Sequence, residues 1–120
     1  MRATAVTART PARADADDAA DLKKLTKQAG EAAQFLKLLG NEKRLLILCF
    51  LAARGEMTVG EIVDVVNLSQ SALSQHLAKL RADGLVAFRR TSQTLHYHVA
   101  DKRALRVLEV LKQIYCGDLK

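Results

Sequence analysis

Residues 58–99 read TVGEIVDVVNLSQSALSQHLAKLRADGLVAFRRTSQTLHYHV and contain three segments with different apolar periods. In the first segment, Thr58 and Glu61 have the spacing of a capping box, and the apolar residues that follow recur at helical spacing. Ser69 opens a second helix, and Gly84 suits the left-handed position just past its end. The buried stripe of this second helix is predicted to be Ala72, Leu73, Leu77 and Leu80. Two short helices joined by a tight turn predict a helix-turn-helix.

The third segment has the two-residue period of a β-strand. Apolar Leu95, Tyr97 and Val99 alternate there with polar Thr94, His96 and His98. Residues 89–93, between Val86 and this strand, predict a polar turn that carries Arg89 and Arg90. A helix-turn-helix followed by a basic hairpin predicts a winged helix, which is mainly α with a small β wing.

A helix from residue 42 to about residue 54 is predicted before the helix-turn-helix. Asn41 can cap its start, and Gly55 can close its end. Its centre, residues 45–51, is apolar on every side, which predicts a helix that is buried all round. The predicted order is therefore helix, helix, helix-turn-helix, two-stranded wing and a last helix.

The first and last of these helices carry further apolar surfaces. Residues 21–39 have one narrow apolar seam, and Asp101 caps a last helix that runs to about Tyr115. The seam consists of Leu22, Leu25, Ala29, Ala32, Leu36 and Leu39, and the stripe of the last helix of Leu105, Leu108, Leu111 and Ile114, widened by Val107 and Val110. A domain of this size has too small an interior to bury all these surfaces. The first and last helices are therefore predicted to form a homodimer interface.

Residues 1–18 differ from the rest in composition. They are rich in Ala, Thr, Arg and Asp and include the only proline, Pro11. Such a segment buries too little apolar surface to be ordered, which predicts a disordered basic arm in front of a domain over residues 19–120. An organellar transit peptide is the alternative interpretation of these arginines.

Charge and polar surface indicate a partner for the helix-turn-helix. The formal net charge is +6, and residues 67–106 hold seven Lys or Arg against two Asp. Hydroxyls and amides can reach base edges, and Lys and Arg neutralise phosphates. Double-stranded DNA is therefore the predicted partner, and a solvated helix face is the alternative. The predicted DNA contacts are Ser69, Gln70, Ser71, Ser74, Gln75, His76, Lys79, Arg89, Arg90 and Gln93.

Other functional classes have weaker support. The chain has no Gly-x-Ser-x-Gly, phosphate loop or paired carboxylates at useful spacing, so neither catalysis nor a cofactor is expected. The longest apolar stretch, residues 45–53, is too short for a membrane span, and a cytoplasmic protein with reduced thiols is expected. His96 and His98 share a strand face that could bind zinc weakly, but a solvated wing face is favoured, so no metal site is predicted.

From about Ala20 to Gly117 the chain resembles the ArsR/SmtB family of bacterial repressors. The resemblance rests on the order of the elements and on residues 68–77 (LSQSALSQHL), 80–86 (LRADGLV) and 41–45 (NEKRL). It implies a homodimer that binds a palindromic operator and releases it when an inducer binds. The cysteines of one family metal site are missing from residues 61–66, and the last helix has Asp101 and Glu109 but no histidine for the other.

Cys49 and Cys116, in Leu-Cys-Phe and Ile-Tyr-Cys, resemble the dithiol branch of this family, which includes BigR, SqrR and HlyU. The resemblance implies that persulfides, polysulfides or oxidants join the two thiols by a disulfide or polysulfide bridge and so lower operator affinity. Because only a thiolate attacks sulfur electrophiles, Cys116, near the chain end, is expected to be the more accessible nucleophile and Cys49 the resolving thiol. The alternatives are a Cys49 that only packs the core, a metal or other inducer, and a winged-helix interaction module without a DNA target. The direction of regulation, repression or displacement of a silencer, stays open.

Overall fold

The computed structural model describes residues 16–117, with side chains from residue 18, so most of the predicted basic arm lies outside the described residues. The chain divides into two compact units, with the boundary between Lys37 and Leu38. Helix α2 (Ala16–Leu39), which lies in the first unit except for its last two residues, begins five residues earlier than the predicted start at residue 21. Near its start, Asp18 suits the helix dipole and Ala19 has high helix propensity. The domain boundaries of 1–18 and 19–120 stay a prediction.

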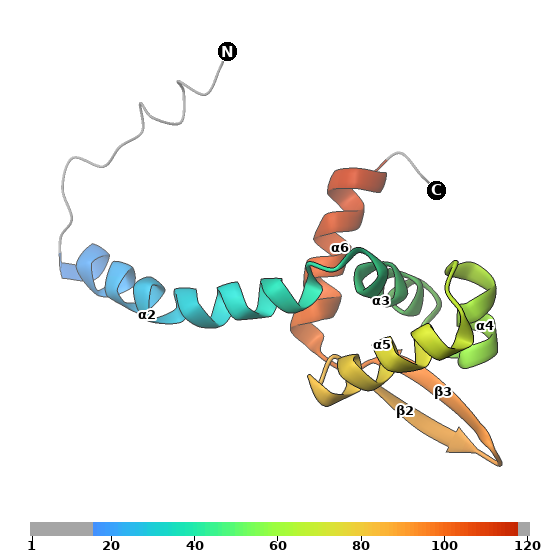
Figure 1. Cartoon of the computed structure of the whole chain (residues 1–120). Helices are drawn as coiled ribbons and strands as arrows, with labels where there is room; N and C mark the ends of the chain where they lie inside the picture. The colour runs from blue at the N-terminus through green and yellow to red at the C-terminus, as the bar shows by residue number, and fades with distance from the viewer. Residues whose placement is uncertain (1–15, 118–120) are drawn as a thin grey trace. The chain divides into compact units, whose positions relative to one another are not determined.

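The second unit contains the winged helix. It comprises α3 (Glu42–Arg54), β1 (Met57–Thr58), α4 (Val59–Val65), α5 (Gln70–Ala82), β2 (Val86–Thr91), β3 (Thr94–Val99) and α6 (Lys102–Cys116). Helices α4 and α5 form the helix-turn-helix, α3 packs against α6, and the β2–β3 hairpin extends past α5 (Figure 1). The predicted fold class and element order are confirmed.

Side-chain caps set the starts of the helices, as predicted. Asn41 Oδ1 accepts from the Arg44 amide at 3.0 Å, and Ser69 Oγ accepts from the Ala72 amide at 3.0 Å. Thr58 and Glu61 form the full capping box, with bonds of 2.9 and 3.2 Å between each amide and the other side chain. Each cap satisfies an amide that has no partner inside its own helix.

Glycines close two helices in backbone conformations that other residues rarely adopt. Gly55 has φ 87° and donates its amide to Leu51 O at 2.8 Å, which ends α3. Gly84 has φ 78° and donates to Arg81 O at 3.0 Å just past α5. Both positions match the predicted helix ends.

The wing is an antiparallel sheet with strand order β1-β3-β2, one strand more than the predicted hairpin. Strands β2 and β3 pair from Val86↔Val99 to Thr91↔Thr94, so the turn between them is only Ser92-Gln93. The predicted polar turn over residues 89–93 is therefore wrong in extent, because Arg89 and Arg90 pair within β2. Strand β1 was not predicted because two residues are too few to show a period.

The core lies between α3, the helix-turn-helix, the sheet and α6. Its largest fully buried side chains are Ile47, Leu48, Leu51, Met57, Ile62, Val66, Leu73, Leu77, Leu80, Leu85 and Val86. Helix α3 is not buried all round in the single chain, because Leu46 and Cys49 are exposed. The prediction for α3 was wrong since an apolar helix centre does not say how many neighbours cover it. None of the helices formed by the described residues is long and apolar enough to cross a membrane.

Candidate nucleic-acid interface and thiol pair

Helix α5 buries one face and exposes the polar side chains expected to contact DNA. Leu73, Leu77 and Leu80 of the predicted stripe face the core, while Ala72, its fourth predicted member, is only half-buried. The exposed set comprises Ser69, Gln70, Ser71, Ser74, Gln75 and Lys79, and His76 is half-buried beside them. The Ser69 hydroxyl already accepts a hydrogen bond from the Ala72 amide, and Lys79 forms an ion pair with Asp83 at 3.5 Å. The rest of the exposed face stays available for a ligand.

The two wing arginines point to opposite faces of the sheet. Arg89 pairs with His96 and Arg90 with Leu95, and consecutive strand residues alternate between faces. Arg90 therefore shares the face of Phe88, while Arg89 lies on the face of His96. The sequence grouped both in one turn, but in the structure they occupy different surroundings.

Arg89 is held by an acidic residue that the sequence analysis missed. Its Nε lies 2.8 Å from Glu56 Oε2 and 3.1 Å from Oε1, and its Nη2 lies 2.9 Å from Oε1. This bonding lowers the pKa of the Glu56 carboxyl and raises the pKa of the Arg89 guanidinium. Glu56 directly precedes β1, so an expectation of that strand beside β3 would have been the signal that placed it near Arg89.

Aromatic contacts join α5 to the wing. The Arg81 guanidinium lies 4.4 Å from the centre of the Phe88 ring, which packs edge-on against Tyr97 at 5.4 Å between ring centres. A cation over a ring face is attracted by its quadrupole, so this contact ties the last turn of α5 to β2. Gln93 is exposed in the two-residue turn at the tip of the hairpin.

The histidines of β3 do not converge with other ligands. His96 Nε2 and Thr91 Oγ1 are 2.8 Å apart, so one His96 ring nitrogen already has a hydrogen-bond partner. Within residues 16–117, no three His, Cys, Asp or Glu side chains gather closely enough to hold a metal ion.

Cys49 on α3 and Cys116 at the end of α6 are free thiols in the same unit. Cys49 is exposed and Cys116 is half-buried, so the expectation that Cys116 is the more accessible thiol is wrong for the single chain. Enough protein surrounds the Cys49 sulfur that burial is the larger cause raising the pKa of this thiol, and the charge of Cys116 raises it further. The two helices that carry these thiols, α3 and α6, pack against each other.

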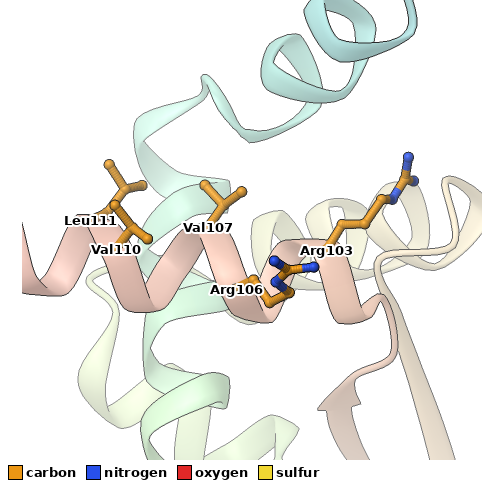
Figure 2. Close-up of a pocket in the computed structure, with 5 residues that line it drawn as sticks. All are labelled: Arg103, Arg106, Val107, Val110 and Leu111. Atoms are coloured by element: carbon orange, nitrogen blue, oxygen red, sulfur yellow. The ribbon is translucent and has the colours of Figure 1, made fainter. Parts of the chain in front are cut away.

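One side of α6 forms a shallow pocket with basic and apolar lining. Figure 2 shows Arg103 and Arg106 at one end, and Val107, Val110 and Leu111 along the helix. Arg103 forms an ion pair with Asp101, the residue that caps α6, at 2.9 Å. Further along the same helix, Ile114 and Tyr115 are 64% and 79% exposed. The predicted stripe of α6 is thus only partly covered within one chain.

Comparison with known proteins identifies the family. The model described as bacterial regulatory protein, arsR family, matches residues 41–87. The transcriptional activator HlyU of Vibrio cholerae serotype O1 is 44% identical over 96 residues, covering 80% of this chain and 88% of HlyU. The structure of the transcriptional regulator HlyU from Vibrio vulnificus CMCP6 matches with a TM-score of 0.75 at 43% identity, covering 80% of this chain and 99% of that chain.

A third similar protein is the transcriptional repressor BigR from Xylella fastidiosa, whose structure matches with a TM-score of 0.72 at 34% identity over 82% of this chain and 96% of BigR. These proteins are transcriptional regulators and not enzymes. The helix-turn-helix, the wing and these similarities agree, so the chain belongs to the arsR family of bacterial regulatory proteins, among the winged-helix regulators of the HlyU and BigR type.

Proposed function

We propose that this DNA-binding transcriptional regulator binds a palindromic operator as a homodimer and releases it when Cys49 and Cys116 become bridged. The proposal for DNA rests on the exposed polar face of α5 beside the basic hairpin. In a two-fold dimer, Ser71, Ser74 and Gln75 enter successive major grooves about one helical turn apart. Arg89, Arg90 and Gln93 of each wing lie at the flanking minor groove or backbone.

The homodimer is supported by apolar side chains that one chain leaves uncovered. Leu22 and Leu25 on α2 are 58% and 64% exposed, and Val110 and Ile114 are exposed on α6. A large exposed apolar patch typically marks an interface. Burying these side chains between two copies also brings two α5 helices under one symmetry axis, which a palindrome requires.

The switch is supported by the packing of α3, which carries Cys49, against α6, which ends at Cys116. The charge of Cys116 also adds to the raised pKa of the Cys49 thiol. Burial raises the pKa of the Cys49 thiol and so lowers its thiolate fraction, and we assign the first attack to Cys116. Its thiolate attacks the outer sulfur of a persulfide R–S–SH, forming Cys116–S–SH and releasing the thiolate RS⁻. Cys49 then attacks the inner sulfur, which forms the disulfide and releases HS⁻. A persulfide on both cysteines instead condenses to a trisulfide with loss of HS⁻.

A bridge would connect α6 to α3, the helix that precedes the helix-turn-helix in the chain. A direct disulfide needs Cα atoms within about 7 Å, and extra sulfur atoms tolerate more. Because two α5 helices must match the operator spacing, a small shift of α3 against α6 weakens binding. A tenfold release requires that the bridge disfavour the bound form by about 1.4 kcal/mol.

The test combines intact mass and a mobility-shift assay on one sample treated with an organic persulfide or with peroxide. The DNA is the duplex that footprinting identifies upstream of the protein's own gene. We expect a bridge within one chain, either a disulfide or a bridge with added sulfur atoms. We also expect about tenfold weaker binding to this duplex. Cys49→Ser and Cys116→Ser are expected to bind like the reduced protein and to ignore both reagents. A bridged species that binds with unchanged affinity, or the lack of any Cys49–Cys116 species, contradicts the switch but not DNA binding.

A further inference from the structure

The contact between Glu56 and Arg89 spans the whole sheet. His96 of the central strand β3 faces Thr58 on one side and Arg89 on the other. Glu56 is two residues before Thr58 and therefore lies on the same face, because side chains alternate along an extended chain. Its carboxylate reaches over β3 to a residue 33 positions away in sequence. The folded sheet alone brings these two charges together.

The bonding pattern leaves part of the Arg89 guanidinium available in a fixed orientation. Glu56 takes the Nε–H and one N–H of Nη2. Both N–H groups of Nη1 and the second of Nη2 remain as donors, because a guanidinium has five. A guanidinium held on one edge is restricted in rotation, so the directions of its remaining N–H groups are fixed. Those groups can bind only acceptors that lie along these directions.

The pair contributes little to the stability of the fold, since both side chains are substantially exposed and water screens such pairs. Its effect on a nucleic acid is larger. The carboxylate cancels the charge that Arg89 would otherwise offer to any phosphate, and phosphate attraction is independent of sequence. Arg90 differs, because within residues 16–117 no ion pair is found for it.

We propose that Glu56 is a positioning residue for DNA recognition, which holds Arg89 so that it favours particular duplexes instead of attracting phosphates in general. This inference rests on the proposed function as a DNA-binding regulator. Glu56 touches Arg89 and not the DNA, and its role is to raise specificity at some loss of affinity.

The decisive variant is Glu56→Gln, measured by salt titration on the operator and on an unrelated duplex of equal length. Without the carboxylate charge beside it, Arg89 should bind an additional phosphate. We expect tighter binding to the unrelated duplex, a salt slope steeper by about 0.9, and a several-fold smaller ratio between the two affinities. In Glu56→Gln with Arg89→Gln, the slope should return to that of the wild type, while the ratio stays low.

Asp64→Asn is the matched control, because it removes one exposed carboxylate from α4, nearby in the chain, without touching Arg89. An equal effect of Asp64→Asn would reduce the result to general charge and overturn the inference. So would an unchanged slope and ratio in Glu56→Gln, or a slope in the double variant as steep as in Glu56→Gln. If the wild type itself shows no preference for its operator, the proposed function fails, which is a distinguishable outcome.

Discussion

At the scale of single residues, neighbours in sequence can have different roles, because successive side chains of a strand point to opposite faces of the sheet. Arg89 and Arg90 are adjacent, yet one is bound to Glu56 and the other lies on the Phe88 face of the hairpin. Cys49 shows the same dependence on surroundings, since solvent reaches the residue while the protein around its sulfur raises the pKa of the thiol.

The wing prediction follows from this difference. Replacing Arg90 with Ala removes a charge that has no ion-pair partner among residues 16–117, so binding to all duplexes should weaken and the salt slope should fall by about one. Fluorescence anisotropy over a series of salt concentrations measures both quantities. Lys112→Ala is the control, because it removes an exposed charge from α6, outside the helix-turn-helix and the wing. Unchanged affinity and slope in Arg89→Ala with Arg90→Ala would show that the wing does not contact DNA.

At the scale of elements, short polar signals define where each helix begins. The four caps at Asn41, Thr58, Ser69 and Asp101 are all made by the residue's own side chain. Helix α4 depends most on its cap, because it has only seven residues and short helices have little intrinsic stability. Its position in turn supports α5, since the two pack together in the helix-turn-helix.

The capping box gives a prediction for stability. Thr58→Ala removes the oxygen that accepts the Glu61 amide at 3.2 Å, and we expect a loss of about 1 kcal/mol in the free energy of unfolding. Urea denaturation at one fixed protein concentration measures it, because association would shift the midpoint. Thr58→Ser keeps a hydroxyl and should lose much less. Equal losses in the two variants would mean that the β-branched methyl, and not the cap, stabilises α4.

At the scale of the whole molecule, uncovered apolar side chains indicate assembly. Leu22, Leu25 and Leu36 on α2 and Val110 and Ile114 on α6 are all more than half exposed in the single chain, and exposed apolar surface typically marks an interface. In a dimer the same helices would be interior elements. The α6 end that carries Cys116 would then lie next to an interface, where a change in α3 or α6 reaches both copies.

The dimer prediction uses a residue that one chain leaves exposed. Ile114→Glu should fold normally but bury a charge between two copies, which is strongly unfavourable, and so should produce monomers that no longer bind the operator. Sedimentation at micromolar concentration measures the mass. Lys112→Glu adds a carboxylate on the same helix, turned by well over a quarter of a circle from Ile114, and should remain dimeric. A wild type that is monomeric and well folded at that concentration would contradict the assembly.

The sequence by itself determined the local elements of this protein. Caps, terminal glycines and the periods of apolar residues predicted α3, α4, α5 and α6 to within about a residue, because each signal acts within one or two turns of its own helix. The same locality made the exposed set on α5 predictable: once Leu73, Leu77 and Leu80 face the core, Ser74 and Gln75 must face away.

Only the tertiary structure decided which distant residues meet. The partner of Arg89, the exposure of Cys49 and the third strand beside β3 depend on contacts between segments tens of residues apart. No periodicity encodes such contacts, because they arise when packing of the core brings strands and helices together. Charge, exposure and pKa are set by those neighbours, so the surface chemistry of the wing and of the thiol pair belongs to the fold as a whole.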